Sequence, residues 1–180
     1  MDKSKHENLL FETLHDLAPV PPDLWKSFQE IVEIKSYKKG RILQADLLDL
    51  YIVLEGIIIK RENSTKQVID FICKKQFIFH NEEVDDCYFE VDNDAVVAFI
   101  SNDDLLKLSN EFPKFKDHIK HFGADVLKQR TLRGRFIVHS AREKKIKLLE
   151  LYPEVYRNCS NADKSSFLGM TPNYYCSIII

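Results

Sequence analysis

The chain has 180 residues, a formal net charge of −2 and 44% hydrophobic residues, a composition typical of a globular protein with room for one sizeable domain or two small ones. No stretch approaches the roughly 20 apolar residues that a membrane-spanning helix requires. The charged segment 1–8 lacks the apolar region and cleavage site of a secretory signal, so we expect a cytoplasmic protein with no membrane partner.

Short helices and then strands are predicted for the first half of the chain. Apolar residues recur at helical spacing in 7–17 and 23–32, and three prolines separate the two segments. Residues 34–72 are rich in β-branched and aromatic residues and are interrupted by turn pairs such as Glu55-Gly56. A further strand region covers 88–100, so this half is expected to be antiparallel β-structure.

Charge is distributed unevenly after residue 76. The charged residues from Gln76 to Asp104 are all acidic, with a loop expected at 81–86, whereas basic residues predominate from Lys114 to Lys147. Two solvated faces would explain this pattern, and so would a basic surface that attracts the phosphates of nucleic acid. The acidic loop, even with His80 beside it, lacks the residue spacing of a calcium-binding loop and is interpreted as solvated.

A long helix is predicted from about Lys114 to Val138. Its apolar side chains follow the four-three-four spacing of a coiled-coil seam, and they are Phe115, Ile119, Phe122 and Val126. Two interpretations are open: this face joins two copies of the chain, or the helix lies on its own β-domain. The dimer is favoured, because the β-half would already have a core of its own.

The last 40 residues contain the strongest motif in the chain. Ser140 and Glu143 form a capping box before an apolar helix that ends at Pro153. A later helix ends at Leu168, Gly169 supplies a tight turn, and Thr171 with Pro172 opens a new helix. Two helices joined by a short glycine-containing turn are the helix-turn-helix layout.

Metal and cofactor sites are not indicated. The cysteines are widely scattered, without the close pair of a typical zinc site, and are expected to be free thiols: Cys73, Cys87, Cys159 and Cys176. His118 and His121 lie one helical turn apart but have no evident third ligand. We therefore expect no metal and no cofactor.

Several segments, in the same order along the chain, resemble the Crp/Fnr-type bacterial transcription regulators. The turn Phe167-Leu-Gly-Met-Thr-Pro172 is similar to the turn of their helix-turn-helix, and 140–156 is similar to the first helix of their DNA-binding domain. Upstream, 37–43 and 50–56 are similar to the opening strands of their cyclic-nucleotide-binding-like β-roll, and 111–115 to the start of their dimer helix.

The resemblance implies an α+β protein in three parts. These are an antiparallel β-roll sensor domain (1–112), a long linker and dimerisation helix (113–139) and a helix-turn-helix DNA-binding domain (140–180). A homodimer would bind double-stranded DNA at half-sites about one helical turn apart. The candidate DNA contacts are Arg142, Lys164, Thr171, Pro172, Asn173, Tyr174 and Ser177.

Two departures from the family pattern affect function. Residues 76–90 contain no Gly, Arg or Lys to hold a cyclic phosphate, so the effector is unidentified and is not expected to be cyclic AMP. The inside of the roll is interpreted either as filled core or as an apolar effector pocket, with Ile52, Leu54, Ile58, Phe71 and Phe99 as its lining.

The second departure lies in the reading helix, where family members commonly have an arginine. Asn173 and Ser177 occupy this region, and Ile178, Ile179 and Ile180 follow with no basic residue. Either the sequence stops short of those basic residues, or DNA binding is weak or lost. The alternative to a regulator is therefore a sensor or interaction protein that keeps the scaffold without binding DNA. An enzyme ranks third, because no G-x-S-x-G, H-E-x-x-H or phosphate-binding glycine loop occurs.

Overall fold

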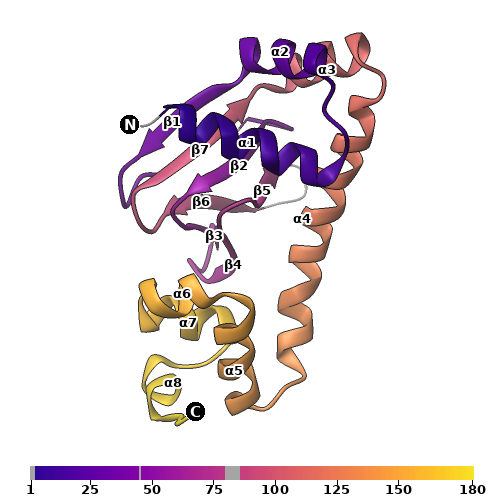
Figure 1. Cartoon of the computed structure of the whole chain (residues 1–180). Helices are drawn as coiled ribbons and strands as arrows, with labels where there is room; N and C mark the ends of the chain where they lie inside the picture. The colour runs from indigo at the N-terminus through magenta and orange to yellow at the C-terminus, as the bar shows by residue number, and fades with distance from the viewer. Residues whose placement is uncertain (1–2, 45, 80–85) are drawn as a thin grey trace.

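The computed structural model describes residues 3–44, 46–79 and 86–180. Figure 1 shows a β-roll at one end and a group of short helices at the other, with the long helix α4 running beside both. The helices are α1 Lys3–Leu17, α2 Pro22–Ile31, α3 Asn102–Glu111, α4 Phe115–Ile137, α5 Ala141–Leu151, α6 Pro153–Asn158, α7 Asn161–Leu168 and α8 Pro172–Ser177. The strands are β1 Glu33–Tyr37, β2 Leu50–Glu55, β3 Ile58–Glu62, β4 Val68–Ile72, β5 Phe77–Phe79, β6 Cys87–Val91 and β7 Ala95–Ile100.

The strands of the described residues form two antiparallel sheets, which confirms the predicted α+β class. One sheet has the order β1-β7-β2-β5 and the other β4-β3-β6. The predicted strand region 88–100 contains two strands, β6 and β7, one in each sheet. The predicted turn at Glu55-Gly56 is confirmed, and Gly56 has a φ of 87°. A Cβ atom there would lie 2.7 Å from the carbonyl oxygen of Asp94, so only glycine fits.

The described residues pack into three apolar cores. One lies between the two sheets and includes Tyr51 and Val53 of β2. Another lies between the β1-β7-β2-β5 sheet and helices α1 to α4, and it contains the alternate β2 residues Leu50, Ile52 and Leu54. Strand β2 is therefore buried on both faces, which explains its continuous apolar sequence.

The remaining core joins the β4-β3-β6 sheet to the C-terminal helices. From the roll it contains Val68 and Phe71 of β4, and from the helices it contains Leu148, Phe167 and Tyr175 among others. The rings of Phe71 and Phe167 meet edge to face with centroids 5.2 Å apart. The C-terminal helices consequently have no separate core in this structure, because they share one with the roll.

Local capping explains where several helices begin. The Ser101 side chain accepts a hydrogen bond from the Asp104 amide at the start of α3, and Ser140 with Glu143 completes the predicted capping box of α5. Pro153 follows α5 and occupies the first turn of α6. These caps satisfy backbone amides that have no partner inside the helix, so the sequence locates them reliably.

No helix in the described part of the chain is long and apolar enough to cross a membrane. Cys73, Cys87, Cys159 and Cys176 all lie in the described part of the chain and are not joined by disulfides. His118 is buried, and its Nε2 lies 3.2 Å from the carbonyl oxygen of Ala18 at the end of α1, whereas His121 is exposed. Within the described ranges, no group of three or more His, Cys, Asp or Glu side chains could hold a metal ion.

Candidate nucleic-acid interface

Helices α7 and α8 are joined by a short turn at Gly169, the arrangement on which the helix-turn-helix prediction rests. Ser160 caps α7 by accepting a hydrogen bond from the Asp163 amide, and Gly169 ends it in the left-handed conformation with a φ of 67°. The Met170 amide then donates to the carbonyl oxygen of Ser165 at 2.9 Å. Thr171 caps α8 by accepting from the Tyr174 amide at 3.3 Å, and Pro172 occupies the first turn.

The turn fixes which face of α8 is exposed. Tyr175 is 2% exposed and packs in the core shared with the roll, and burial raises the pKa of its hydroxyl to about 12. Thr171, Pro172, Asn173, Tyr174 and Ser177 are exposed. The five α8 candidates are thus together on one accessible end of the molecule, and their side chains are polar or apolar but uncharged.

Lys164 does not belong to this surface, although sequence reasoning placed it there. Its side chain is buried, and its ammonium group donates to the carbonyl oxygen of Tyr156 at 2.9 Å. Burial lowers its pKa. Lys164 therefore supports the chain between α6 and α7 and is not available to a DNA phosphate.

A second buried lysine, Lys145 of α5, holds the end of α8. Its ammonium group donates to the carbonyl oxygens of Ile178 at 2.7 Å and Tyr175 at 3.3 Å, and it lies 4.7 Å from the centre of the Tyr175 ring. A positive charge at this position satisfies carbonyl groups that the short helix leaves unpaired. Sequence reasoning missed this role, because Lys145 stands in a run of basic residues that gives no sign of burial. Arg142, in the same run, is exposed as expected.

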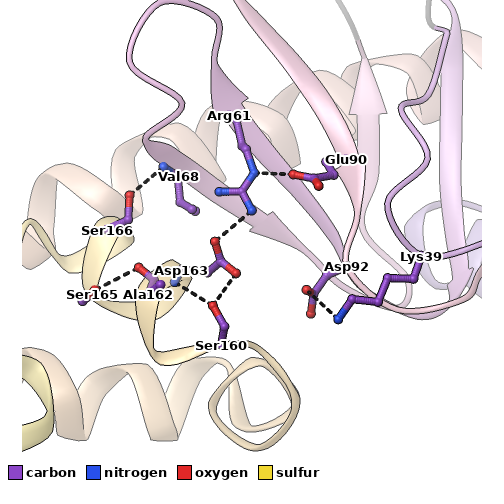
Figure 2. A network of polar contacts seen from close by, with 10 residues as sticks. All are labelled: Lys39, Arg61, Val68, Glu90, Asp92, Ser160, Ala162, Asp163, Ser165 and Ser166. Atoms are coloured by element: carbon purple, nitrogen blue, oxygen red, sulfur yellow. Dashed lines mark hydrogen bonds and ion pairs between the residues drawn. The ribbon is translucent and has the colours of Figure 1, made fainter. Parts of the chain in front are cut away.

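Polar contacts also fix α7 to the roll (Figure 2). Arg61 of β3 bonds Glu90 through Nε at 2.5 Å and Asp163 of α7 through Nη2 at 2.8 Å. Beside it, the Val68 amide at the start of β4 donates to the Ser166 hydroxyl at 2.9 Å. All of these atoms are partly buried, so they set the orientation of α7, and hence of α8, relative to the roll.

The apolar seam predicted on the long helix faces inward. Phe115 and Phe122 are each 1% exposed and belong to the core beneath the β1-β7-β2-β5 sheet, and Ile119 and Val126 pack against that core. The structure therefore supports the second interpretation of these four residues, in which the helix lies on its own β-domain. An apolar residue alone does not reveal whether its face is covered by the same chain or by another.

The five residues predicted for the effector pocket do not line one cavity. Ile52 and Leu54 lie in the core beneath the helices, Ile58 and Phe99 in the core between the sheets, and Phe71 in the core shared with the C-terminal helices. Four of the five are completely buried, which supports the interpretation as filled core.

A different cavity, of about 100 Å³, lies between the roll and α4. The roll contributes mainly apolar side chains, including Ile72, Phe77 and Phe89, together with Asp70 and Lys60. The lining from α4 is Val126, Gln129, Arg130 and Arg133. The charged residues of this cavity come from segments about 60 positions apart in the sequence. No local sequence pattern could therefore predict the cavity.

Comparison with known proteins shows the fold. No protein-family model and no curated protein matches the chain. Among solved structures, FixK2 from Bradyrhizobium japonicum is 15% identical, with a TM-score of 0.65 and 81% of each chain covered. The c-di-GMP responsive global regulator CLP from Xanthomonas campestris is 14% identical, with a TM-score of 0.64 over 87% of this chain and 88% of that one. A protein from Eubacterium rectale described as a transcriptional regulator of the Crp/Fnr family is 11% identical, with a TM-score of 0.67 over 89% of this chain and 84% of that one.

Proposed function

From the Crp/Fnr-like fold of this chain, we propose that it is a transcription regulator that binds double-stranded DNA as a homodimer. In this proposal the roll (1–112) senses a signal, the long helix (113–139) joins two copies of the chain, and the C-terminal helices (140–180) contact DNA. This is a binding function and involves no catalysis.

The observation that carries the proposal is the accessible face of α8. Gly169 and the Thr171 cap orient this helix so that Tyr175 is buried while Asn173, Tyr174 and Ser177 are exposed. An asparagine side chain can bond both N6 and N7 of adenine in the major groove, and hydroxyl groups can bond phosphates or base edges. Exposed Arg142, at the start of α5, supplies a cation for the DNA backbone.

The outer face of α4 supports the homodimer. Exposed residues of small or apolar character recur there at three-four spacing, the pattern of a coiled-coil seam, and they are Ala124, Leu127, Thr131, Gly134 and Val138. Leu127 is 61% exposed and Val138 81% exposed in the single chain. This stripe lies opposite the buried seam, so α4 can pack against the roll with one face and against a second copy of the chain with the other.

The cavity between the roll and α4 is the proposed effector site. It touches the helix that carries the dimer stripe, so an occupant would act on the dimer directly. Its size of about 100 Å³ is below the roughly 300–1,000 Å³ typical of ligand pockets, so it leaves room for an effector of only a few atoms and not for a cyclic nucleotide. Residues 81–85 of the predicted acidic loop lie outside the described residues. The argument against cyclic AMP as the effector therefore rests on the sequence of 76–90.

Binding to a pool of genomic DNA fragments at low ionic strength tests the function. We expect affinity that falls steeply with salt, and an Arg142→Ala variant whose salt dependence is weaker by about one released counterion. Asn173→Ala should lose about 1–3 kcal/mol on the preferred sequence and relax specificity at one position. Lys116→Ala, an exposed cation at the far end of α4, is the matched control and should bind like the natural chain.

A second candidate is a sensor or interaction protein that does not bind DNA. It is favoured by one observation, the uncharged face of α8 together with an Ile179 side chain that is 87% exposed. If no fragment of the pool binds in a salt-sensitive manner at low ionic strength, the regulator is excluded and this candidate stands.

A further inference from the structure

Asp70 is an acidic side chain buried where three parts of the molecule meet. It lies on β4 and is 7% exposed. It lines the cavity between the roll and α4, and its Oδ1 accepts hydrogen bonds from the Phe71 amide at 2.8 Å and from the Tyr152 hydroxyl at 3.5 Å. Tyr152, between α5 and α6, is itself buried and belongs to the core shared with the roll.

We propose that Asp70 is a proton-binding site that links the packing of α4 and the C-terminal helices on the roll to pH. The proposal concerns packing within one chain, and it holds whether or not the chain binds DNA.

The surroundings of the carboxyl group favour its neutral form when these parts are packed. The cavity wall around it is largely apolar, with Ile72, Phe77 and Phe89 from the roll and Val126 from α4. Burial in such surroundings disfavours a charged carboxylate. Burial accordingly raises the pKa of Asp70 to about 7, well above the 3.8 of an exposed aspartate.

The charged and titratable groups that face Asp70 come from each element packed against it. Lys60, its register partner on β3, and Arg133 of α4 attract the ionised form and limit the rise of its pKa. Arg130 of α4 lines the same cavity. Tyr152 donates a hydrogen bond, and Cys73, beyond the end of β4, has its own pKa raised to about 12 by burial and by the nearby carboxylates of Glu154 and Asp70.

The direction of the effect follows from linkage. The packed form holds the proton more tightly than a form in which Asp70 is exposed, so packing is strongest below about pH 4 and weakens as the pH rises toward 7. The packing equilibrium then changes by up to about tenfold per pH unit in this window and is level above it. Ionised Asp70 is drawn toward Lys60 and Arg133, which alters the contact between β4 and α4.

Two NMR measurements on the full chain test the proposal. The first follows the ¹³C shift of the Asp70 carboxyl group with pH and should give a midpoint near 7. The second follows amide hydrogen exchange of Val68, corrected for the intrinsic rate, because this amide donates to Ser166 across the interface. Its protection should fall about 10- to 100-fold from pH 5 to 7 in the natural chain.

Two variants make the second measurement specific. Asp70→Asn keeps the shape of the side chain but removes the ionisable carboxyl group. The protection of the Val68 amide should then be independent of pH over this range. Asp163→Asn removes a different interface carboxylate, the partner of Arg61, and should lower protection at every pH while keeping the slope. A carboxyl midpoint near 4, or equal pH profiles for the natural chain and Asp70→Asn, would overturn the proposal. If Asp70→Asn does not fold, the carboxyl titration of the natural chain decides alone.

Discussion

Arg61 Nη2 lies 2.8 Å from Asp163 Oδ1, and this contact joins strand β3 of the roll to helix α7 across 102 residues of sequence. The same guanidinium group also bonds Glu90 of β6. Asp163 has a local role as well, because its Oδ2 accepts from the Ser160 hydroxyl at the start of α7. One arginine therefore ties the sheet, the interface and a helix cap into one network.

Replacing Arg61 with alanine should destabilise the chain by about 2 kcal/mol, because two partly buried carboxylates lose their cation. Urea unfolding monitored by circular dichroism measures the change. Lys120→Ala, which removes an exposed pair with Asp117, is the control and should cost less than about 0.5 kcal/mol. Equal costs for the two variants would show that the network at Arg61 contributes nothing beyond a surface pair.

Two glycine substitutions should act in opposite directions. Gly169→Ala forces a Cβ atom into a left-handed conformation and should cost about 1–2 kcal/mol. Gly123→Ala lies inside α4, where a Cβ atom would meet nothing within 4 Å, and should stabilise the chain by about 0.5–1 kcal/mol. The same unfolding assay measures both, and a stabilising Gly169→Ala would contradict the turn geometry described here.

His118 should make the chain less stable in acid. The ring is 1% exposed, and burial lowers its pKa from the usual 6.5. Since the folded state binds the proton less well than the unfolded state, the contribution of neutral His118 is complete above about pH 6.5 and is lost as the pH falls. Between pH 7 and 5 the natural chain should therefore lose unfolding free energy relative to the His118→Phe variant. A pH profile for His118→Phe that matches that of the natural chain would refute the assignment.

Leu127→Glu should separate the proposed dimer, since it places a charge in the middle of the exposed stripe on α4. Sedimentation at micromolar concentration should show a dimer for the natural chain and a monomer for the variant. Leu106→Glu on α3 is the control, because Leu106 is exposed to a similar degree, 53% against 61%, on another helix. A natural chain that remains monomeric at these concentrations would remove the dimer from the proposed function.

Much of the fold could be predicted from the sequence because its signals are local. The capping box of Ser140 and Glu143, the left-handed Gly169 and the Thr171-Pro172 start of α8 all depend on residues within one turn of each other. Backbone sterics and the pairing of helix-end amides act over that same distance, so a short segment is sufficient to specify each of these features. The exposed face of α8 follows from them.

The partners of side chains could not be predicted in the same way. Phe115 and Phe122 have the spacing of a dimer seam, yet they are buried beneath the chain's own sheet. Lys145 stands in a basic stretch and Lys164 was predicted to contact DNA, yet both are buried and bond carbonyl oxygens. The spacing and charge of a residue indicate which kinds of contact it can make. Which element covers the residue depends on contacts between segments that are distant in the sequence.

The sequence by itself determined where several helices begin, their caps and the turn between α7 and α8, because backbone geometry and hydrogen bonding act between near neighbours. Only the tertiary structure decided that α7 is held by Arg61, that Asp70 is buried beside Tyr152, and that the outer face of α4 is the one left exposed. Burial and charge pairing depend on which distant segments meet, and that is a property of the packed chain.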